Sequence, residues 1–267
     1  EWFFEKEIIT ALSIVLTAWP IGIALGLVSQ GLIADIHGLA WVMYATAGFT
    51  LFGLLLTALF YREAPAPADL GAMPIRFGLP KRQFVHMAVV GAAWTLFNAS
   101  FIVLISFAPD VLIEGGYGET EARSVTSLFM WVSVVAAPLG GRVMEVLGHV
   151  TSTIFAMLLI ASAGMLAIAY NMAPEITFVV AGIFFGIPAG ALMSLSSEAV
   201  SPDNRGPGLG IFYTWYYLGM AIAPALAGWT KDVTANAAAP VILAAAMLVM
   251  TVLWVGLFRL LQRSWPI

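Results

Sequence analysis

The stretch Thr17–Asp35, "TAWPIGIALGLVSQGLIAD", has a counterpart much later in the chain at Thr214–Asp232, "TWYYLGMAIAPALAGWTKD". The two stretches align without a gap at a constant offset of 197 residues. The shared positions are Thr17 with Thr214, Gly22 with Gly219, Ala24 with Ala221, Gly31 with Gly228 and Asp35 with Asp232. Glycines and helix-end charges are constrained by packing and chemistry, so these matches carry structural information. We infer an internal duplication of two consecutive helices.

The composition excludes a soluble globular protein. Hydrophobic residues make up 61% of the chain and charged residues only 10%, with a mean hydropathy of +0.96. Soluble domains are typically about 45–50% apolar. We therefore predict an integral, multi-pass membrane protein whose solvent is the lipid bilayer. The net charge of −4 gives no indication of a nucleic-acid partner, and the absence of cysteine excludes disulfides and thiolate metal sites. No metal or other cofactor is expected.

The apolar segments predict an all-α fold. Runs of about 20 uncharged residues are long enough to cross the bilayer, and helices satisfy their own backbone groups in lipid. Eight such runs occur: Ile8–Ala34, Leu39–Tyr61, Phe84–Ala108, Ser124–Gly141, Val150–Asn171, Ile176–Ser197, Gly208–Thr230 and Ala239–Phe258. We expect eight transmembrane helices, with kinks at the internal prolines Pro20, Pro188 and Pro224.

The distribution of Lys and Arg predicts the orientation of these helices. Eight crossings place both termini on one side of the membrane. Arg123 and Lys231 fall on the other side, against nine cations on the side of the termini: Lys6, Arg62, Arg76, Lys81, Arg82, Arg142, Arg205, Arg259 and Arg263. The positive-inside rule then predicts cytoplasmic termini, and we expect the bacterial inner (plasma) membrane.

The duplication also predicts the domain organisation. The segment "REAPAPADLGAMPIRFGLPKRQ", Arg62–Gln83, contains four prolines and two glycines and reads as a linker. Residues 84–267 then form a six-helix half, residues 63–83 a cytoplasmic linker, and residues 1–62 the last two helices of another half. Four further helices are expected upstream, giving twelve in two parallel-related halves.

Two motifs resemble the major facilitator superfamily of secondary transporters, from its fifth helix to its twelfth. The segment "PLGGRVMEVLGHVTS", Pro138–Ser152, is similar to the family's loop between helices eight and nine. "SPDNRGPGLGIFYTWYYLG", Ser201–Gly219, resembles the start of its eleventh helix. His149 stands where a second basic residue is common, and Pro20 lacks the flanking glycines of the family's antiporter motif, so the antiporter mechanism of export is not indicated.

The predicted function is secondary transport of a small solute. Parallel-related halves place a substrate site between them near the bilayer midplane, with access alternating as the halves rock. An exporter of amphipathic compounds is an alternative, and a non-transporting receptor or sensor on the same scaffold is another. An enzyme is not expected, because His37, His86 and His149 lie near the interfaces and no His, Asp or Glu cluster converges inside the membrane.

Proton coupling, as in symport, has no obvious residue in this chain. All fifteen acidic residues fall in loops or at predicted helix ends. A carboxylate buried in the membrane is costly and therefore usually functional. We expect any coupling proton to bind in the four upstream helices, or transport not to be proton-linked.

The candidate substrate-binding residues are polar and aromatic groups at membrane depth. Asn98, in "AAWTLFNASFIV", lies one helical turn from Trp94, and its amide needs a partner away from water. An interhelical hydrogen bond that only holds the bundle is an equal alternative. Ser127 and Trp131 share a face of the next helix, although packing or an interfacial Trp explains them better.

Aromatic residues extend this candidate site to two further helices. "FYTWYYLG", Phe212–Gly219, places Tyr213 and Tyr217 on one face, and their hydroxyls need partners. A cavity wall and plain core packing are both compatible with this spacing. Trp19 lies at a similar depth on the duplicated helix.

A gate is implied at the cytoplasmic side by the family resemblance. Its candidate residues are Gly141, Arg142, Glu145, Gly148, Glu198 and Arg205. We expect Arg142 to pair with Glu198, because both stand at helix ends on the same side. Glu145 is expected near the start of the helix that begins at Ile8, where free amide groups favour a carboxylate. A solvated Arg142 that only obeys the positive-inside rule is the alternative.

Overall fold

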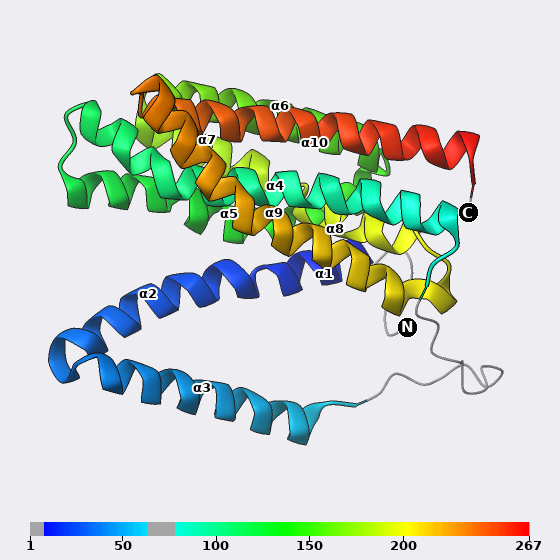
Figure 1. The fold of residues 1–267 in the computed structure, drawn as a ribbon, viewed down its shortest axis with the longest axis horizontal. Helices are drawn as coiled ribbons and strands as arrows, with labels where there is room; N and C mark the ends of the chain where they lie inside the picture. Colours follow the sequence, from blue (N-terminus) through cyan, green and yellow to red (C-terminus); the bar gives the residue numbers. More distant parts are fainter. Residues whose placement is uncertain (1–7, 63–77, 267) are drawn as a thin grey trace.

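The computed structural model of the chain describes residues 8–62 and 78–266, and the regular elements in these ranges are helices. Within these ranges there is no strand, as the apolar segments predict. The elements in order are α1 (Ile8–Leu16), α2 (Ala18–His37), α3 (Leu39–Phe60), α4 (Lys81–Glu114), α5 (Glu119–Leu147), α6 (Val150–Ala169), α7 (Pro174–Gly186), α8 (Ala189–Glu198), the 3-10 helix η1 (Pro202–Asn204), α9 (Arg205–Thr234) and α10 (Ala238–Ser264). Figure 1 shows their arrangement.

The first predicted helix is divided at Thr17 into α1 and α2. Pro20 has no amide hydrogen, so the Leu16 carbonyl loses the partner that a continuous helix would provide. The Thr17 hydroxyl donates to the Ile14 carbonyl at 2.7 Å and closes the last turn of α1. The chain therefore changes direction between α1 and α2.

The sixth predicted helix is likewise divided, into α7 and α8. Pro188 stands at the division and cannot donate to the Phe184 carbonyl one turn earlier. Pro224, in contrast, lies inside α9, which stays continuous over 30 residues. Of the three predicted proline positions, Pro188 thus stands at a break, and Pro20 follows one by three residues.

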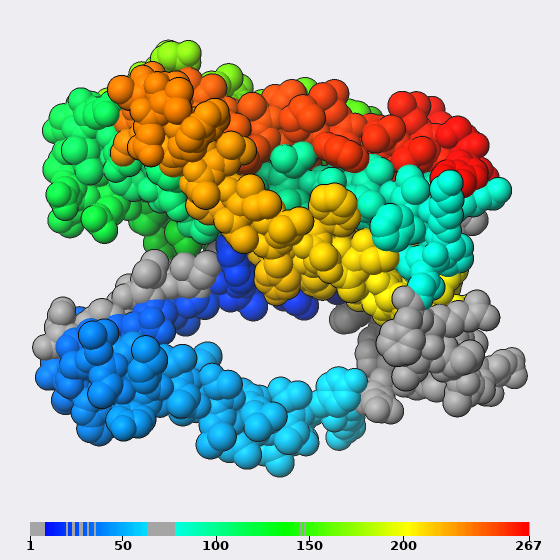
Figure 2. Space-filling model, viewed as in Figure 1, coloured from blue at the N-terminus to red at the C-terminus, as the bar shows by residue number. Residues whose placement is uncertain are grey.

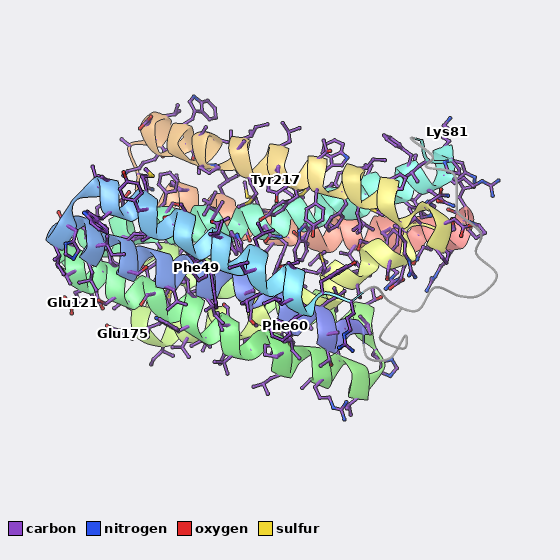
Figure 3. The ribbon with its side chains drawn as sticks, turned by 90° about the horizontal axis from the view of Figure 1, so that it is seen from below. Phe49, Phe60, Lys81, Glu121, Glu175 and Tyr217 are labelled. Atoms are coloured by element: carbon purple, nitrogen blue, oxygen red, sulfur yellow. The ribbon has the colours of Figure 1, made fainter. Side chains whose placement is uncertain are left out.

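Seven helices of the described part are long and apolar enough to cross a membrane. The divided pair α1 and α2 is not among them, so the predicted count of eight is not confirmed. Charged residues mark both ends of the bundle: Lys81 lies at one end, and Glu121 and Glu175 lie at the other (Figure 3). We call the end at which α4 begins and α10 ends the terminal end, and the other the distal end.

Helices α4 to α10 form a single bundle. Helix α10 packs against α4 and α6, α9 packs against α4, and α7 packs against α5 and α6. Large apolar side chains fill the space between them, and those that are fully buried include Phe129, Phe178, Phe212, Phe258, Met87 and Leu104. Burial of such side chains and close interhelical contact hold a bundle together in lipid, where no hydrophobic effect acts between helices.

The first three helices are attached to this bundle at the terminal side only. Helix α1 packs against α5 and α8, whereas α2 diverges from the bundle toward its distal end (Figure 1). Helix α3 returns beside α2 and has no buried residue. Figure 2 shows open space between α3 and the bundle. This apolar helix of 22 residues therefore packs against α2 but buries none of its residues.

Candidate substrate cavity

A cavity of about 270 Å³ lies between the first two helices and the bundle. Its wall comes from α1, α2, α4, α5, α7, α8 and α9, together with Thr17. The lining residues are Leu16, Thr17, Trp19, Trp94, Phe97, Asn98, Phe101, Ser133, Val134, Ala137, Phe185, Gly186, Ala189, Tyr213, Tyr216 and Tyr217. None of these described lining residues carries a charge. The site is therefore suited to hydrogen bonding and ring contact rather than to binding by charge.

Five of the seven predicted substrate-binding residues line this cavity, and they come from three helices. They are Trp19 on α2, Trp94 and Asn98 on α4, and Tyr213 and Tyr217 on α9. Figure 3 shows Tyr217 on α9. The structure thus brings together residues that lie almost two hundred positions apart in the sequence.

The other two predicted residues do not line the cavity. Trp131 on α5 is 55% exposed, and the Ser127 hydroxyl donates to the Ser124 carbonyl of its own helix at 2.7 Å. Their spacing predicts a shared helix face, but not which neighbour that face meets. Helix α5 instead presents Ser133, two residues beyond Trp131 and on another face of the helix, to the cavity.

Asn98 offers one free polar atom to the cavity. Its side chain is only 8% exposed, and its Nδ2 donates to the Trp94 carbonyl at 2.9 Å within α4. In the described part of the chain, no donor reaches its Oδ1 atom. An interhelical hydrogen bond was the alternative prediction for this amide, but the hydrogen bond that it donates lies within α4. The Asn98 oxygen therefore remains available to a bound solute, because a buried acceptor gains from any donor that reaches it.

Half of the residues that line the cavity are aromatic. Phe97 on α4 stacks on Phe185 of α7 with ring centroids 4.1 Å apart and planes inclined by 7°. Trp19 contacts Phe101 at 5.4 Å, and Tyr213 stacks with Tyr217 at 6.1 Å. Ring faces of this kind bind flat or apolar groups by dispersion and quadrupole contacts. Sequence reasoning missed Phe97 and Phe185, because phenylalanine in an apolar run carries no distinguishing signal.

Ser133 supplies a second polar position that sequence reasoning missed. Its hydroxyl lies 2.6 Å from the Phe129 carbonyl and 3.0 Å from the Gly182 carbonyl, so it links α5 to α7. The side chain is 8% exposed and lines the cavity. A single serine in "WVSVVAAPLGG" gives little reason to expect this placement.

The duplicated helices contribute equivalent positions to the cavity. Leu16 corresponds to Tyr213 at the offset of 197 residues, and Trp19 corresponds to Tyr216. All four line the cavity. The duplication therefore extends to the placement of side chains around one shared space.

Helix α1 packs closely against α5 and α8 on the terminal side of the cavity. Ser13 is completely buried, and its hydroxyl donates to the Ile9 carbonyl at 2.8 Å. A Cβ atom on Gly190 of α8 would collide with the Ser13 hydroxyl and would lie 2.7 Å from the Ile9 carbonyl oxygen. A Cβ on Gly141 of α5 would lie 2.6 Å from the same hydroxyl. We call this contact of Ser13 with Gly141 and Gly190 the α1 seam.

The predicted ion pair between Arg142 and Glu198 is not found. The Glu198 carboxylate accepts hydrogen bonds from Arg259 and from Gln262 of α10, the latter at 3.3 Å. Arg259 also donates through Nε to Thr151 of α6 at 2.9 Å. The end of α8 meets α10 and α6 here. The sequence placed Glu198 and Arg142 at the same membrane depth, but depth alone does not show which helix ends are neighbours.

The remaining gate candidates lie at the terminal end of α5 and α9. Gly148 caps α5 with φ of 68°, a left-handed conformation that favours glycine, and its amide donates to the Met144 carbonyl at 3.1 Å. Arg142 is exposed on α5, and Arg205 is exposed at the first residue of α9. The side chain of Glu145 lies outside the described part of the structure, so its predicted approach to α1 stays a prediction.

A second ion pair joins α4 and α9 at the distal end. Lys231 Nζ lies 2.6 Å from an Asp110 carboxylate oxygen, with about two fifths of each side chain exposed. Lys231 is one of only two cations predicted on that side, which was an available signal for this pair. Among the described residues, no group of His, Asp or Glu side chains could hold a metal ion.

Comparison with known proteins identifies the fold and the family. The chain is similar to the crystal structure of the E. coli fucose:proton symporter FucP, with a TM-score of 0.73 and 14% sequence identity over 96% of this chain and 70% of that one. No significant match is found among curated protein sequences. The profile of the Major Facilitator Superfamily matches residues 89–264, about two thirds of the chain, and confirms the resemblance of the helix-eight and helix-eleven motifs. The chain therefore belongs to the major facilitator superfamily.

Proposed function

We propose that this chain is part of a secondary transporter that moves a small solute by alternating access between two six-helix halves. The family is one of membrane transporters rather than enzymes, and the chain is an integral multi-pass membrane protein. In this proposal residues 84–267 are one half, residues 1–62 are the last two helices of the other half, and residues 63–83 link them. The uncovered faces of α3 support four further helices that complete the first half.

The observation that carries the proposal is the origin of the cavity wall. Leu16, Thr17 and Trp19 come from the first two helices, and the other lining residues come from the bundle. A site built from both halves is exposed to one side or the other when the halves rock. The α1 seam holds α1 against α5 and α8, and in this proposal it opens when access switches to the terminal side.

The lining favours a small amphipathic solute. A cavity of about 270 Å³ with ring faces and a few hydrogen-bonding groups suits a solute that has one apolar face and one or two polar groups. Such a solute also fits the alternative of an exporter of amphipathic compounds, and the two differ only in the direction of net flux. We place the termini in the cytoplasm and the protein in a bacterial inner membrane, from the excess of Lys and Arg at the terminal side.

Coupling to protons is a further part of the proposal. The E. coli protein of similar fold is a fucose:proton symporter. None of the described residues that line the cavity is acidic, so the proton would bind elsewhere, in the four helices that complete the first half.

Counterflow tests this function. The protein is reconstituted in liposomes preloaded with unlabelled para-hydroxyphenylacetamide, a neutral aromatic amide, and uptake of the radiolabelled compound is followed. We expect preloading to accelerate uptake, because a carrier returns its site faster when the site is occupied. Protein-free liposomes are the control. Equal rates with and without preloading, in liposomes where the protein binds the amide, would indicate a receptor rather than a carrier.

A further inference from the structure

A second cavity of about 210 Å³ lies on the terminal side of the substrate cavity, between α1, α8 and α9. We call it the vestibule. Leu12 and Leu209 line it from α1 and α9, and they are again related by the offset of 197 residues. Tyr213 lines both the vestibule and the substrate cavity. The two spaces therefore meet at one side chain and follow one another along the face of α9.

The vestibule differs from the substrate cavity in charge. Arg205 lines it, and the described lining residues include no acidic group. No carboxylate of the described residues pairs with Arg205, whereas Arg259 pairs with Glu198 and Lys231 pairs with Asp110. The guanidinium thus brings an uncompensated positive charge and five N–H donors to this space.

The neighbouring polar groups leave Arg205 as the main donor. The hydroxyls of Ser196 and Ser197 donate to carbonyls of α8, at 2.8 Å and 2.7 Å. The Tyr213 hydroxyl has no hydrogen-bond partner among the described residues. Arg205 and Tyr213 lie two helical turns apart on one face of α9, about 12 Å along the axis at 1.5 Å per residue. That separation accommodates a solute with an anionic head at Arg205 and a ring toward Tyr213.

We infer that the vestibule binds the oxyanion of a small aromatic or amphipathic monoanion on its way between the terminal side and the substrate cavity. The inference rests on the proposed transport function and narrows its solute to organic acids of this class. Arg205 binds the carboxylate or similar group through charge-assisted hydrogen bonds, which are the stronger kind. The apolar part of the solute lies against Leu12, Leu209 and the ring of Tyr213.

Binding of an isosteric pair of probes tests this inference. The affinities of para-hydroxyphenylacetate and para-hydroxyphenylacetamide for the full chain in phosphatidylcholine nanodiscs are measured by calorimetry. We expect the acid to bind about tenfold more tightly than the amide, because one charge-assisted hydrogen bond contributes that much. R205Q should abolish this ratio and R205K should restore part of it. R263Q, which removes an exposed cation of α10 at the same end, should leave the ratio unchanged.

The outcomes separate this inference from the transport proposal. Equal affinities of both probes in wild type and R205Q overturn the inference and leave the substrate cavity intact. Unchanged binding of both probes to N98A overturns the role of that cavity, and failure of both probes to bind wild type overturns both. A lipid phosphate is the other source of an oxyanion at this depth. Loss of the acid's advantage on adding phosphatidylglycerol would assign Arg205 to lipid and overturn the inference.

Discussion

Replacing Gly190 with leucine is expected to lower counterflow at least tenfold while the protein still inserts and folds. The glycine lies against Ser13 and the Ile9 carbonyl in the α1 seam, with no room for a Cβ atom. Overpacking such a contact costs about 1–3 kcal/mol. Because the cost falls on the conformation in which α1 is seated, the equilibrium shifts by about tenfold toward the opened seam. The measurement is uptake per unit of reconstituted protein.

Three further substitutions test whether this loss arises from the seam rather than from helix propensity. Gly210→Leu is the matched control, since nothing lies within 4 Å of a Cβ atom there and the residue is also inside a helix. It should retain nearly full activity. Gly190→Ala should impair counterflow less than leucine does, and adding Ser13→Gly to Gly190→Ala should restore part of the activity, because it removes the hydroxyl but not the Ile9 carbonyl that the new Cβ meets. Equal activity of Gly190→Leu and Gly210→Leu would contradict the account of the seam.

Replacing Asn98 with alanine is expected to raise the KM of counterflow about tenfold, with little change in expression. Asn98 Oδ1 accepts no hydrogen bond from the described residues and lines a cavity rich in aromatic rings, and loss of one hydrogen bond to a solute there costs about 1–3 kcal/mol. Substrate binding should weaken, while the stability of α4 should hold, because the amide bonds only to its own helix.

Ser100→Ala is the control for this prediction. Ser100 is completely buried two residues further along α4, its hydroxyl donates to the Phe97 carbonyl at 2.7 Å, and it does not line the cavity. Its removal should change the KM less than twofold, which is within about 0.4 kcal/mol. A KM that responds equally to both variants would make Asn98 a packing residue.

Polarity at membrane depth was the signal that predicted the hydrogen-bonding residues Asn98, Tyr213 and Tyr217 of the cavity from the sequence. Asn98, Tyr213 and Tyr217 carry groups that lipid cannot satisfy, so they had to face protein or water, and the structure places them around one cavity. Phe97 and Phe185 form as much of its wall, yet an apolar ring is equally at home against lipid. Their role depends on how α4 and α7 are rotated, which no local pattern records.

Helix spacing predicted which residues share a face but not which neighbour that face meets. Ser127 and Trp131 do follow one another along α5, but the face of α5 at the cavity is that of Ser133. The wrong prediction of the partner of Glu198 has the same cause. Depth alone allowed Arg142, and the packing of α8, α6 and α10 at the terminal end selects Arg259 instead. The rotation of each helix and the identity of its neighbours are set by packing of the whole bundle, so the spacing within one helix does not predict them.

The helix breaks at Thr17 and Pro188 could be predicted only in part from the sequence. A proline inside an apolar run predicts a missing hydrogen bond, and breaks occur beside Pro20 and at Pro188. Pro224 has the same chemistry, yet α9 continues through it. Tertiary packing decides whether the lost hydrogen bond bends a helix or ends it.

The most direct test of alternating access is labelling of a single cysteine at Trp19. The natural chain has no cysteine, so Trp19→Cys adds one thiol to the cavity wall. A membrane-impermeant methanethiosulfonate reagent is added to one side of sealed, oriented vesicles and then to the other, with and without para-hydroxyphenylacetamide. We predict reaction from the distal side, protection by the solute, and a rise in reaction from the terminal side when Gly190→Leu opens the seam. Reaction from one side alone, unchanged by solute and by Gly190→Leu, would contradict a site that is exposed alternately to both sides.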